Sequence, residues 1–590
     1  MPLLRHVLLP LASAWVLLAC APPVHLATVE PPPAAPPAEQ VADLVLRNGT
    51  VVTVDEARPQ ASAIAVRDGR ILAVGSNADV AAHVGERTRV IDLAGRLAIP
   101  GFIEGHGHFM GLGQSRMILD LTTATTWEEI VEMVAEAAAE ARPGEWIRGR
   151  GWHQERWDPV PSPTVDGVPL HHELSAVSPE NPVLLTHASG HAAFANALAM
   201  EMAEIDMDTP DPAGGTIVRD AEGRATGLLR QRAQGIVARV HARAEEARSP
   251  AEREADSRRA ATLASEEILA NGITSFHDAG SSFETIDFLR TLADEGDLPV
   301  RLYVMVRGET NEVMDARLPD YRMIGHGDGF LTVRAIKRQI DGALGSHGAW
   351  LLEPYADLPE TGGMALEPPE VMQGTAEVAL RHGFQLATHA IGDRGNREAL
   401  DLYERAFRQA GVDGRAERWR IEHAQHVDPA DVPRFAELGV IASMQGVHAT
   451  SDGPWVPRRL GEARTERTSY LWRSLLEAGV VVTNGTDAPV EDISPIASFY
   501  ASVTRHMADC NRFFPEQAMT REEALHSYTL ANAYAAFEED IKGSITPGKL
   551  ADIVVLSRNI LTVPEAEIRD AEIDYTIVGG EVRYQRRGAR

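Results

Sequence analysis

The sequence predicts an α/β protein with a (β/α)₈ TIM-type barrel, a small β-sandwich formed by both ends of the chain, and an insertion early in the barrel. From residue 100 onward, apolar runs typical of strands alternate with helical patterns roughly eight times, which favours a closed parallel sheet. Residues 41–99 and 541–590 contain short β-rich runs and turns instead. One sandwich shared by both ends is therefore the most economical architecture.

The start of the chain has the layout of a secretory signal. In residues 1–19, a short positive stretch precedes an apolar run that is too short to span a bilayer comfortably. Leu17 to Cys20 resembles the lipobox of bacterial lipoproteins, in which Cys20 receives lipid; a plain signal peptide with an incidental cysteine is the alternative. Residues 20–40 are rich in Pro and Ala and predict a semi-rigid tether. We therefore expect a protein of the bacterial cell envelope that meets the membrane only through its lipid anchor.

The folded part begins with the first half of the sandwich and continues into the barrel. Residues 41–99 contain turn signals at Asn48-Gly49 and Asp68-Gly69. The barrel is expected over residues 100–540, and residues 111–234, which lack clean alternation, are interpreted as the insertion. The strand-like runs after residue 100 are Pro182–Leu185, Gly272–Phe276, Pro299–Val306, Leu331–Ile340, Phe384–Thr388, Trp419–Glu422, Val440–Met444 and Val480–Thr483.

Three helices stand out in the sequence. Trp127–Ala141 and Pro250–Ala270 have helical patterns, and Thr520–Glu538 opens with Thr520-Arg-Glu-Glu, a capping box. Short runs over Ala551–Leu556 and Tyr575–Arg583 then predict the strands of the C-terminal half of the sandwich, residues 541–590.

The composition excludes several classes of partner and site. Of 590 residues, 44% are hydrophobic, which is enough for a sizeable core, and the net charge of −29 repels phosphate backbones, so nucleic-acid binding is excluded. The chain has 2 cysteines, too few for a thiolate zinc site, whereas its 21 histidines allow imidazole ligands. The expected partner is a small-molecule substrate, and the sequence leaves the oligomeric state open.

The strongest chemical signal is a pair of histidines at the end of an apolar strand. His106 and His108 follow Pro100-Gly101, and side chains two residues apart on a strand point to the same face, so both imidazoles can reach one metal ion. Active sites of barrels lie at the C-terminal ends of the strands. Such a pair often arises by chance, and its place after the strand is what makes it informative.

Four more candidates occur at or near the ends of later strands. His389, His423 and Asp487 each follow an apolar run, and Lys337 lies on a strand between the histidines. Each could be an ordinary structural residue, but together they form an ordered set. Imidazole and carboxylate ligands without thiolate fit Zn²⁺, Mn²⁺, Fe²⁺ or Ni²⁺.

The segments around these residues resemble the amidohydrolase superfamily. Pro100–His108 is similar to the motif of its first barrel strand. Other segments resemble the branch called amidohydrolase family 3, which includes proteins similar to N-substituted formamide deformylase. These segments are Asp341–Gly345, His389–Asp393, Ile421–Gln425, Ser443–Gln445, Thr486–Val490 and Gly543–Asp552. The matches extend from about residue 43 to residue 583.

The resemblance implies a centre with one or two divalent ions, Zn²⁺ above all. His106 and His108 would bind the more buried ion together with Asp487, and His389 and His423 the more exposed one. Lys337 would bridge both ions if its amine carries a CO₂-derived carbamate, because an unmodified ammonium has no lone pair. The alternative for Lys337 is a lysine that forms a salt bridge, and the polar Arg338-Gln339 that follows it departs from the apolar strand expected in this branch.

These residues predict a hydrolase of non-peptide C–N bonds, such as those of an N-acyl amine, a formamide or a cyclic amide. A metal ion lowers the pKa of bound water from about 15.7 to about 7, and Asp487 would act as the general base and then as the acid. No Gly-x-Ser-x-Gly motif indicates a serine nucleophile. An esterase or lactonase using the same site, and a non-catalytic metal-binding envelope lipoprotein, are the alternatives.

A second group of residues is expected to contact substrate. Its members are His191, His277, His448, Trp152 and Asp452. For His277, a structural role is an interpretation nearly as strong as substrate contact. For Trp152, packing against other aromatic side chains is the first interpretation. Gly446 replaces the proline expected in this branch, so the loop before His448 is expected to differ. Asp341 and Asp393 are expected to order loops rather than to act chemically.

Overall fold

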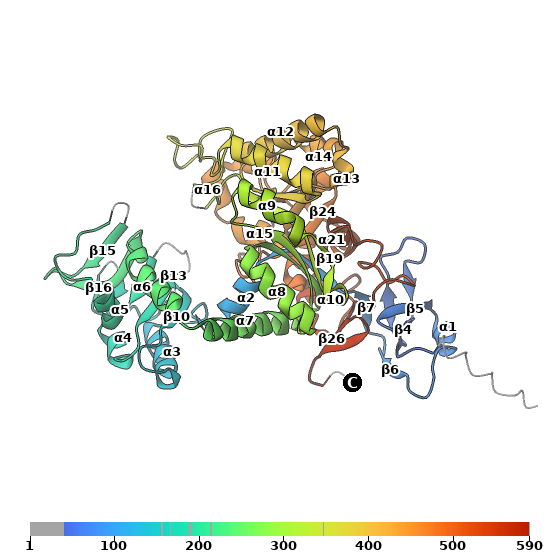
Figure 1. The fold of residues 1–590 in the computed structure, drawn as a ribbon, viewed down its shortest axis with the longest axis horizontal. Coiled ribbons are helices and arrows are strands. Elements are labelled where there is room, and N and C mark those ends of the chain that lie inside the picture. Colours follow the sequence, from blue (N-terminus) through green and yellow to red (C-terminus); the bar gives the residue numbers. More distant parts are fainter. Residues whose placement is uncertain are drawn as a thin grey trace, which may run out of the picture.

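The computed structural model describes residues 41–588, apart from residues 155–156, 166, 188–191, 213–214 and 346. The expected signal peptide, Cys20 and the tether lie outside the described residues. Figure 1 shows three bodies along the long axis of the molecule, with the barrel in the centre, the sandwich on one side and a separate lobe on the other. Within the described part of the chain, no helix has both the length and the apolar character to cross a membrane.

The central body is the predicted TIM-type barrel. Its strands run parallel, and they are, in spatial order, β8 (Phe102–Gly107), β17 (Ile273–Ser281), β18 (Arg301–Val306), β20 (Leu331–Gln339), β21 (Gln385–Ala390), β22 (Arg420–His423), β23 (Ile441–Gln445) and β24 (Val482–Gly485). The short β19 (Met323–Gly325) adds to β20 from outside this path. The fold-class prediction is confirmed, but the assignment of Pro182–Leu185 to the alternating series is wrong. That run forms β13 (Val183–His187) in another sheet, because apolar periodicity does not say which sheet a strand joins.

The barrel closes where its first and last strands meet. The backbone N–H of Asp487 donates to the carbonyl of His106 over 2.8 Å, and that of His108 donates to the carbonyl of Ala488 over 2.7 Å. Nδ2 of Asn532 lies across the same seam and donates to the carbonyls of Ile103 (2.7 Å) and Asn484 (2.9 Å). The seam thus brings the ends of β8 and β24, which carry three of the candidate ligands, into direct contact.

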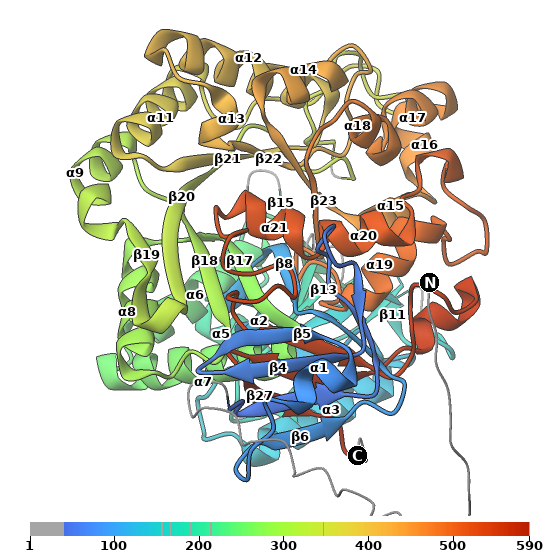
Figure 2. The same ribbon diagram turned by 90° about the vertical axis from the view of Figure 1, so that its right-hand side faces the viewer.

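Helices cover the outside of the barrel, as Figure 2 shows. They include α7 (Pro250–Ala270), α8 (Phe283–Glu295), α9 (Asn311–Tyr321), α11 (Pro369–His382), α12 (Asp393–Ala410), α14 (Val432–Leu438), α18 (Trp472–Glu477), α19 (Pro495–Thr504), α20 (Arg521–Ser527) and α21 (Leu530–Ala535). Shorter helices in the barrel loops are α10 (His326–Gly329), α13 (Gly414–Glu417), α15 (Gly446–Asp452), α16 (Val456–Leu460) and α17 (Glu462–Thr468).

The last predicted helix is interrupted. Thr520 and Glu523 form the expected capping box at the start of α20. The continuous helix expected to Glu538 is wrong, because Thr529 adopts φ −130° and ψ −92°, outside the helical region. The break separates α20 from α21, the helix that carries Asn532 to the barrel seam.

Both ends of the chain form one sandwich. One sheet has the order β5-β4-β1-β6 and the other β27-β26-β25-β7-β2-β3. The strands are β1 (Leu44–Arg47), β2 (Thr50–Val52), β3 (Gln60–Ala61), β4 (Ala63–Arg67), β5 (Arg70–Gly75), β6 (Arg89–Asp92), β7 (Leu97–Pro100), β25 (Ile553–Leu556), β26 (Ile573–Val578) and β27 (Glu581–Gln585). Ile99 of β7 lies opposite Val554 of β25 in antiparallel register, so residues from the two ends of the sequence are neighbours in one sheet.

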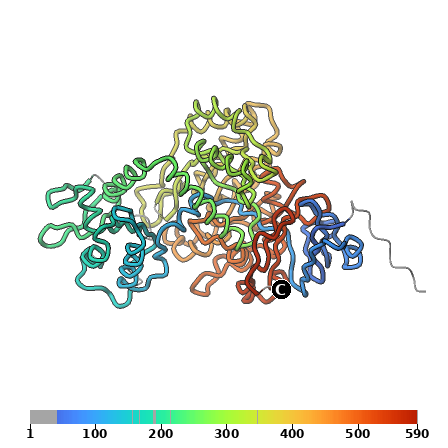
Figure 3. Tube along the Cα trace, turned by 60° about the horizontal axis from the view of Figure 1, so that its bottom comes forward, coloured from blue at the N-terminus to red at the C-terminus, as the bar shows by residue number. Residues whose placement is uncertain are grey.

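The lobe is built on a sheet of its own. The chain leaves the barrel through α2 (Phe109–Ser115) and returns through α7, and Figure 3 shows the lobe as a body beside the barrel. Its sheet has the order β15-β16-β14-β13-β10-β9. The remaining strands and the helices are β9 (Leu119–Asp120), β10 (Ile147–Trp152), β11 (Thr164–Val165), β12 (Val168–Pro169), β14 (Ala192–Ala195), β15 (Gly215–Arg219), β16 (Ala225–Gln231), α3 (Trp127–Glu140), α4 (His172–Val177), α5 (Ala197–Met202) and α6 (Gln234–Glu246).

Candidate metal centre

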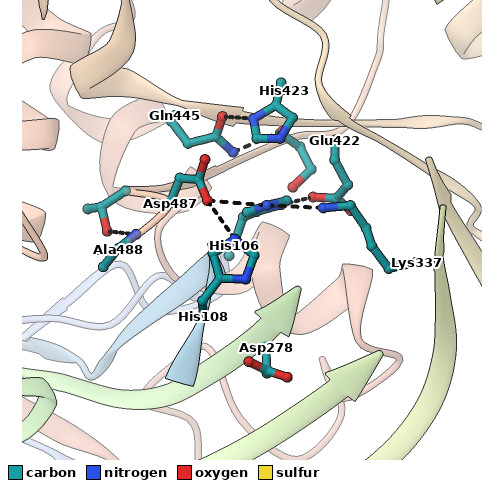
Figure 4. A network of polar contacts seen from close by, with 12 residues as sticks. His106, His108, Asp278, Lys337, Glu422, His423, Gln445, Asp487 and Ala488 are labelled. Atoms are coloured by element: carbon teal, nitrogen blue, oxygen red, sulfur yellow. Dashed lines mark hydrogen bonds and ion pairs between the residues drawn. The ribbon is translucent and has the colours of Figure 1, made fainter. Parts of the chain in front are cut away.

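Six residues that the sequence marked as candidate ligands come together at the C-terminal end of the barrel. They are His106, His108, Lys337, His389, His423 and Asp487 (Figure 4 labels five of them). Each comes from the end of a different strand, except for the pair on and just after β8. The position of the cluster follows from the parallel sheet, whose strand ends all meet at one face of the barrel.

The distances within the cluster suit a shared metal ion. Oδ1 of Asp487 lies 3.1 Å from Nε2 of His108 and 3.6 Å from Nε2 of His106. One ligand atom from each of these three residues falls within 4.8 Å of the others. Oδ1 of Asp487 is also buried without a hydrogen-bond partner among the described residues. Two imidazoles and a carboxylate form a donor set that Zn²⁺ accepts, so the residues present fit the ion.

The other three residues surround this core. Nζ of Lys337 lies 3.3 Å from Nε2 of His106. The ring centroid of His423 lies 4.6 Å from that of His106 and 4.5 Å from that of His389. The cluster is therefore continuous from His108 through His106 and His423 to His389.

Hydrogen bonds fix which nitrogen the imidazoles of His106 and His423 turn toward the centre. Nδ1 of His106 contacts Oε2 of Glu422, and Nδ1 of His423 lies 2.8 Å from Oε1 of Gln445. Both contacts leave Nε2 of the ring for a metal ion. Nε2 of His389 lies 3.8 Å from Oδ1 of Asp341, too far for a hydrogen bond, and is buried without a hydrogen-bond partner among the described residues. Oriented imidazoles of this kind are typical of metal sites.

Glu422 is in turn held by a buried cation. Nε of Arg420 lies 2.7 Å from Oε1 of Glu422, and its Nη2 donates to the carbonyl of Gly105 and to Oγ of Ser443, each over 2.7 Å. Both charged side chains are 0% exposed. Burial on its own raises the pKa of Glu422, but the charges of Arg420 and His106 outweigh it and hold that pKa well below its usual range.

The imidazoles of His106, His389 and His423 are neutral at pH 7, the form that can bind a metal ion. Burial, and then the charge of Lys337, lowers the pKa of His106 to about 4 and holds the pKa of His389 well below its usual range. Burial is also the main reason that the pKa of His423 is far below normal. Burial lowers the pKa of Lys337 to about 8. Neutral imidazoles at pH 7 keep a lone pair for a metal ion.

Two of the candidate ligand residues have an unusual backbone. His423 has φ +75° and Asp487 has φ +60°, a region that side-chain-bearing residues rarely adopt. His423 is the last residue of β22, and Glu422 and His423, although neighbours in the sequence, both contact His106. Such conformations cost of order 1–3 kcal/mol each and concentrate at functional sites.

Three supporting residues were not predicted from the sequence. Arg420, Glu422 and Gln445 lie behind the imidazoles of His106 and His423, and none of the three belongs to a sequence pattern typical of metal ligands. A signal was available, since Arg420 and Glu422 are two residues apart on a predicted buried strand, where unpaired charges are rare.

The residues expected to contact substrate lie in several places. His448 lies beside the cluster, with its ring 6.2 Å from His423 and its Nδ1 3.1 Å from Nε2 of Gln425. Asp452, on the same helix α15, accepts a hydrogen bond from Tyr470 over 2.6 Å. Substrate contact by His448 and Asp452 stays a prediction.

The other three expected contacts are placed differently. His277 is fully buried, with Nδ1 3.2 Å from Nη1 of Arg420, and both its substrate contact and its structural alternative stay predictions. Trp152 lies in the core of the lobe, where its Nε1 donates to the carbonyl of Leu185 over 2.9 Å. His191 lies outside the described residues. Asp341 accepts hydrogen bonds from the backbone of Ile391 and Gly392, as expected of a residue that orders a loop.

Comparison with known proteins shows the family to which the chain belongs. Residues 89–584 match the family model described as the amidohydrolase family. The chain is 34% identical over 566 residues to Protein LONG AFTER FAR-RED 3 of Arabidopsis thaliana, with 93% of each chain covered. It is 30% identical over 563 residues to N-substituted formamide deformylase of Arthrobacter pascens, covering 93% of this chain and 100% of the relative.

A solved structure extends the likeness to three dimensions. An uncharacterized metal-dependent hydrolase from Pyrococcus horikoshii OT3 has a TM-score of 0.71 and 27% sequence identity, over 89% of this chain and 99% of that one. The family match, the barrel and the metal-binding geometry agree with one another. The chain is a metal-dependent hydrolase, and it belongs to the amidohydrolase family.

Proposed function

We propose that this hydrolase cleaves non-peptide C–N bonds, such as those of N-acyl amines, formamides or cyclic amides. The observation that carries the proposal is the position of Asp487, whose Oδ1 lies within 3.6 Å of Nε2 of both His106 and His108. A carboxylate in this position lies beside the point where the two histidines would hold an ion. It can therefore take a proton from a water molecule bound there. The relative named N-substituted formamide deformylase supports the choice of a C–N bond.

The residues of the cluster would hold Zn²⁺ or a similar ion, and Lys337 would contribute oxygen ligands as a CO₂-derived carbamate. When bound, such an ion lowers the pKa of water from about 15.7 to about 7 and polarises a carbonyl group. Asp487 accepts the proton that the attacking water loses and then returns it to the departing nitrogen, so that the amine leaves neutral. His106 and His423 are kept in one orientation throughout by Glu422 and Gln445.

The test is Asp487→Asn compared with Asp509→Asn, which changes an exposed aspartate that accepts hydrogen bonds from Asn511. Loss of the general base should lower kcat by about 10²–10⁴-fold, measured on a panel of formamides and N-acyl amines with metal supplied in excess. Metal content, measured by mass spectrometry, should remain close to that of the parent protein, because the amide oxygen can still serve as a ligand. Equal rates for the two variants would rule out the proposed role of Asp487.

An esterase or lactonase activity at this site is the second candidate. An activated water at this site could attack the carbonyl group of an ester as well as that of an amide. Rates on pairs of an amide and an ester that share the same acyl group separate the two activities. A preference for the ester across such pairs would replace the proposed C–N hydrolysis.

We also propose that Cys20 anchors the chain in the bacterial cell envelope by lipid. The lipobox-like Leu17 to Cys20 and the Pro-rich stretch after it support this location. Cys20→Ser should move the protein from the membrane fraction to the soluble envelope fraction, and an unchanged distribution would count against the anchor.

A further inference from the structure

Arg307 lies at the mouth of the barrel, one residue beyond the end of β18. Tyr303 and Met305 of that strand pack inside the barrel with Ala335 of β20. Because side chains alternate along a strand, Arg307 continues this inward-facing series. Gln339 does the same on β20, two residues after Lys337 and opposite His389 in register. Arg307 and Gln339 are thus adjacent to the metal centre at its open end.

The structure holds Arg307 in this place. Its Nη2 donates to Oε1 of Gln339 over 3.2 Å, and its backbone N–H donates to the carbonyl of Ser281 over 2.9 Å. Its aliphatic stem crosses Gly280, where a Cβ atom would approach Cβ and Cδ of Arg307 to 2.5 Å. Gly280 has φ +131°, which other residues rarely adopt, so the backbone beneath the arginine is suited to glycine alone.

The guanidinium has most of its hydrogen-bonding capacity left. Arg307 is exposed, and in the described part of the chain it forms no ion pair and only the one side-chain hydrogen bond to Gln339. A guanidinium carries five N–H donors. The nearby carboxylates are already engaged, since Glu422 contacts Arg420 and His106 and Asp487 contacts the two histidines.

Gln339 connects Arg307 to the metal centre. Its Oε1 accepts the hydrogen bond from Arg307, and its residue lies opposite His389 in the register of β20 and β21. A molecule bound beside His389 would therefore lie next to the guanidinium.

We propose that Arg307 binds a carboxylate of the substrate, so that the preferred substrates are N-acyl amino acids or similar amides with a carboxylate close to the scissile nitrogen. The planar guanidinium matches a carboxylate through two parallel hydrogen bonds. A carboxylate carries one negative charge, which the one positive charge of Arg307 can balance. This inference rests on the proposed C–N hydrolysis for the nature of the cleaved bond, whereas the recognition of a carboxylate rests on Arg307 itself.

The kinetic test compares N-formylphenylalanine with N-formylphenethylamine, which lacks only the carboxylate. The metal-loaded parent enzyme should prefer the first compound by about 10–100-fold in kcat/KM, the range of a charge-assisted contact. Arg307→Gln should abolish this preference. Arg405→Gln, which also breaks an arginine–glutamine contact (2.9 Å to Gln373) but on the outer helices, should retain it. No preference in the parent, or a preference that survives Arg307→Gln, would overturn the inference.

A binding measurement separates this inference from the proposed reaction. Calorimetry on metal-loaded Asp487→Asn should show tighter binding of N-formylphenylalanine, and the difference should vanish in the double variant with Arg307→Gln. If the parent enzyme hydrolyses neither compound but the binding difference depends on Arg307, carboxylate recognition stands and formamide hydrolysis falls. If both compounds bind equally, or neither binds, the inference about Arg307 is overturned.

Discussion

Glu422 accepts a hydrogen bond from Nδ1 of His106, and this contact turns Nε2 of the imidazole toward Oδ1 of Asp487, 3.6 Å away. Arg420 holds Glu422 from the other side, so that a cation, a carboxylate and an imidazole form a chain inside the barrel. The side chains of His106 and Glu422 are 1% and 0% exposed. The orientation of one candidate ligand therefore depends on residues that do not themselves face the metal position.

Glu422→Gln should weaken metal binding by about 10–100-fold, the usual effect of losing a partner behind a ligand. The glutamine keeps the shape of the side chain but loses the negative charge. That charge makes the imidazole of His106 more basic and therefore a stronger metal ligand. The measurement is metal affinity by competition with a chelator, on variants whose circular dichroism matches the parent protein. Glu404→Gln, which alters a surface ion pair with Arg434, is the control and should not change the affinity. Equal affinities for both variants would show that Glu422 does not act through His106.

Lys337 should make metal loading depend on bicarbonate. A carbamate supplies oxygen ligands, whereas an ammonium group 3.3 Å from Nε2 of His106 repels a cation. Protein loaded with Zn²⁺ in the presence of bicarbonate should hold more metal than protein loaded under CO₂-free conditions. Lys337→Met should remove this difference. If bicarbonate has no effect on the metal content of the parent protein, Lys337 is not a carbamylated ligand.

Asn532→Ala should destabilise the barrel at its seam. The amide donates to two backbone carbonyls, one on β8 and one on β24, and its loss leaves buried acceptors without partners. We expect the free energy of unfolding to fall by about 1–3 kcal/mol, followed by tryptophan fluorescence in urea.

The matched control for the seam is Asn511→Ala, which removes an exposed amide that donates to Asp509. Its unfolding should resemble that of the parent protein. If Asn532→Ala unfolds at the same urea concentration as this control, the seam does not depend on Asn532.

The fold could be predicted largely from local sequence patterns. The sequence located the strands that carry His106, Lys337, His389 and His423, because apolar strands alternating with helices predict a parallel barrel. The assignment of Pro182–Leu185 to the alternating series failed, since periodicity describes a strand and not its sheet. The break at Thr529 was also missed, because it reflects the tertiary position of α21 at the seam rather than a local signal.

The candidate site could likewise be predicted only in part from the sequence. The sequence identified every residue of the cluster at the strand ends, because the strand pattern gives the face and the end on which a side chain lies. It did not identify Gln445 or Arg307 as neighbours of His423 and Gln339, because a strand pattern does not give the side-chain contacts between neighbouring barrel strands. The orientation of each imidazole likewise depends on the folded structure.

The metal content of the purified protein tests the central claim most directly. Mass spectrometry of the parent protein after loading with Zn²⁺ should find at least one tightly bound ion per chain, whereas His106→Ala should lose it, and hydrolysis should disappear with the ion and return when Zn²⁺ is restored. A parent protein that binds no transition metal, or that hydrolyses its substrates equally well after the metal is removed, would contradict the account.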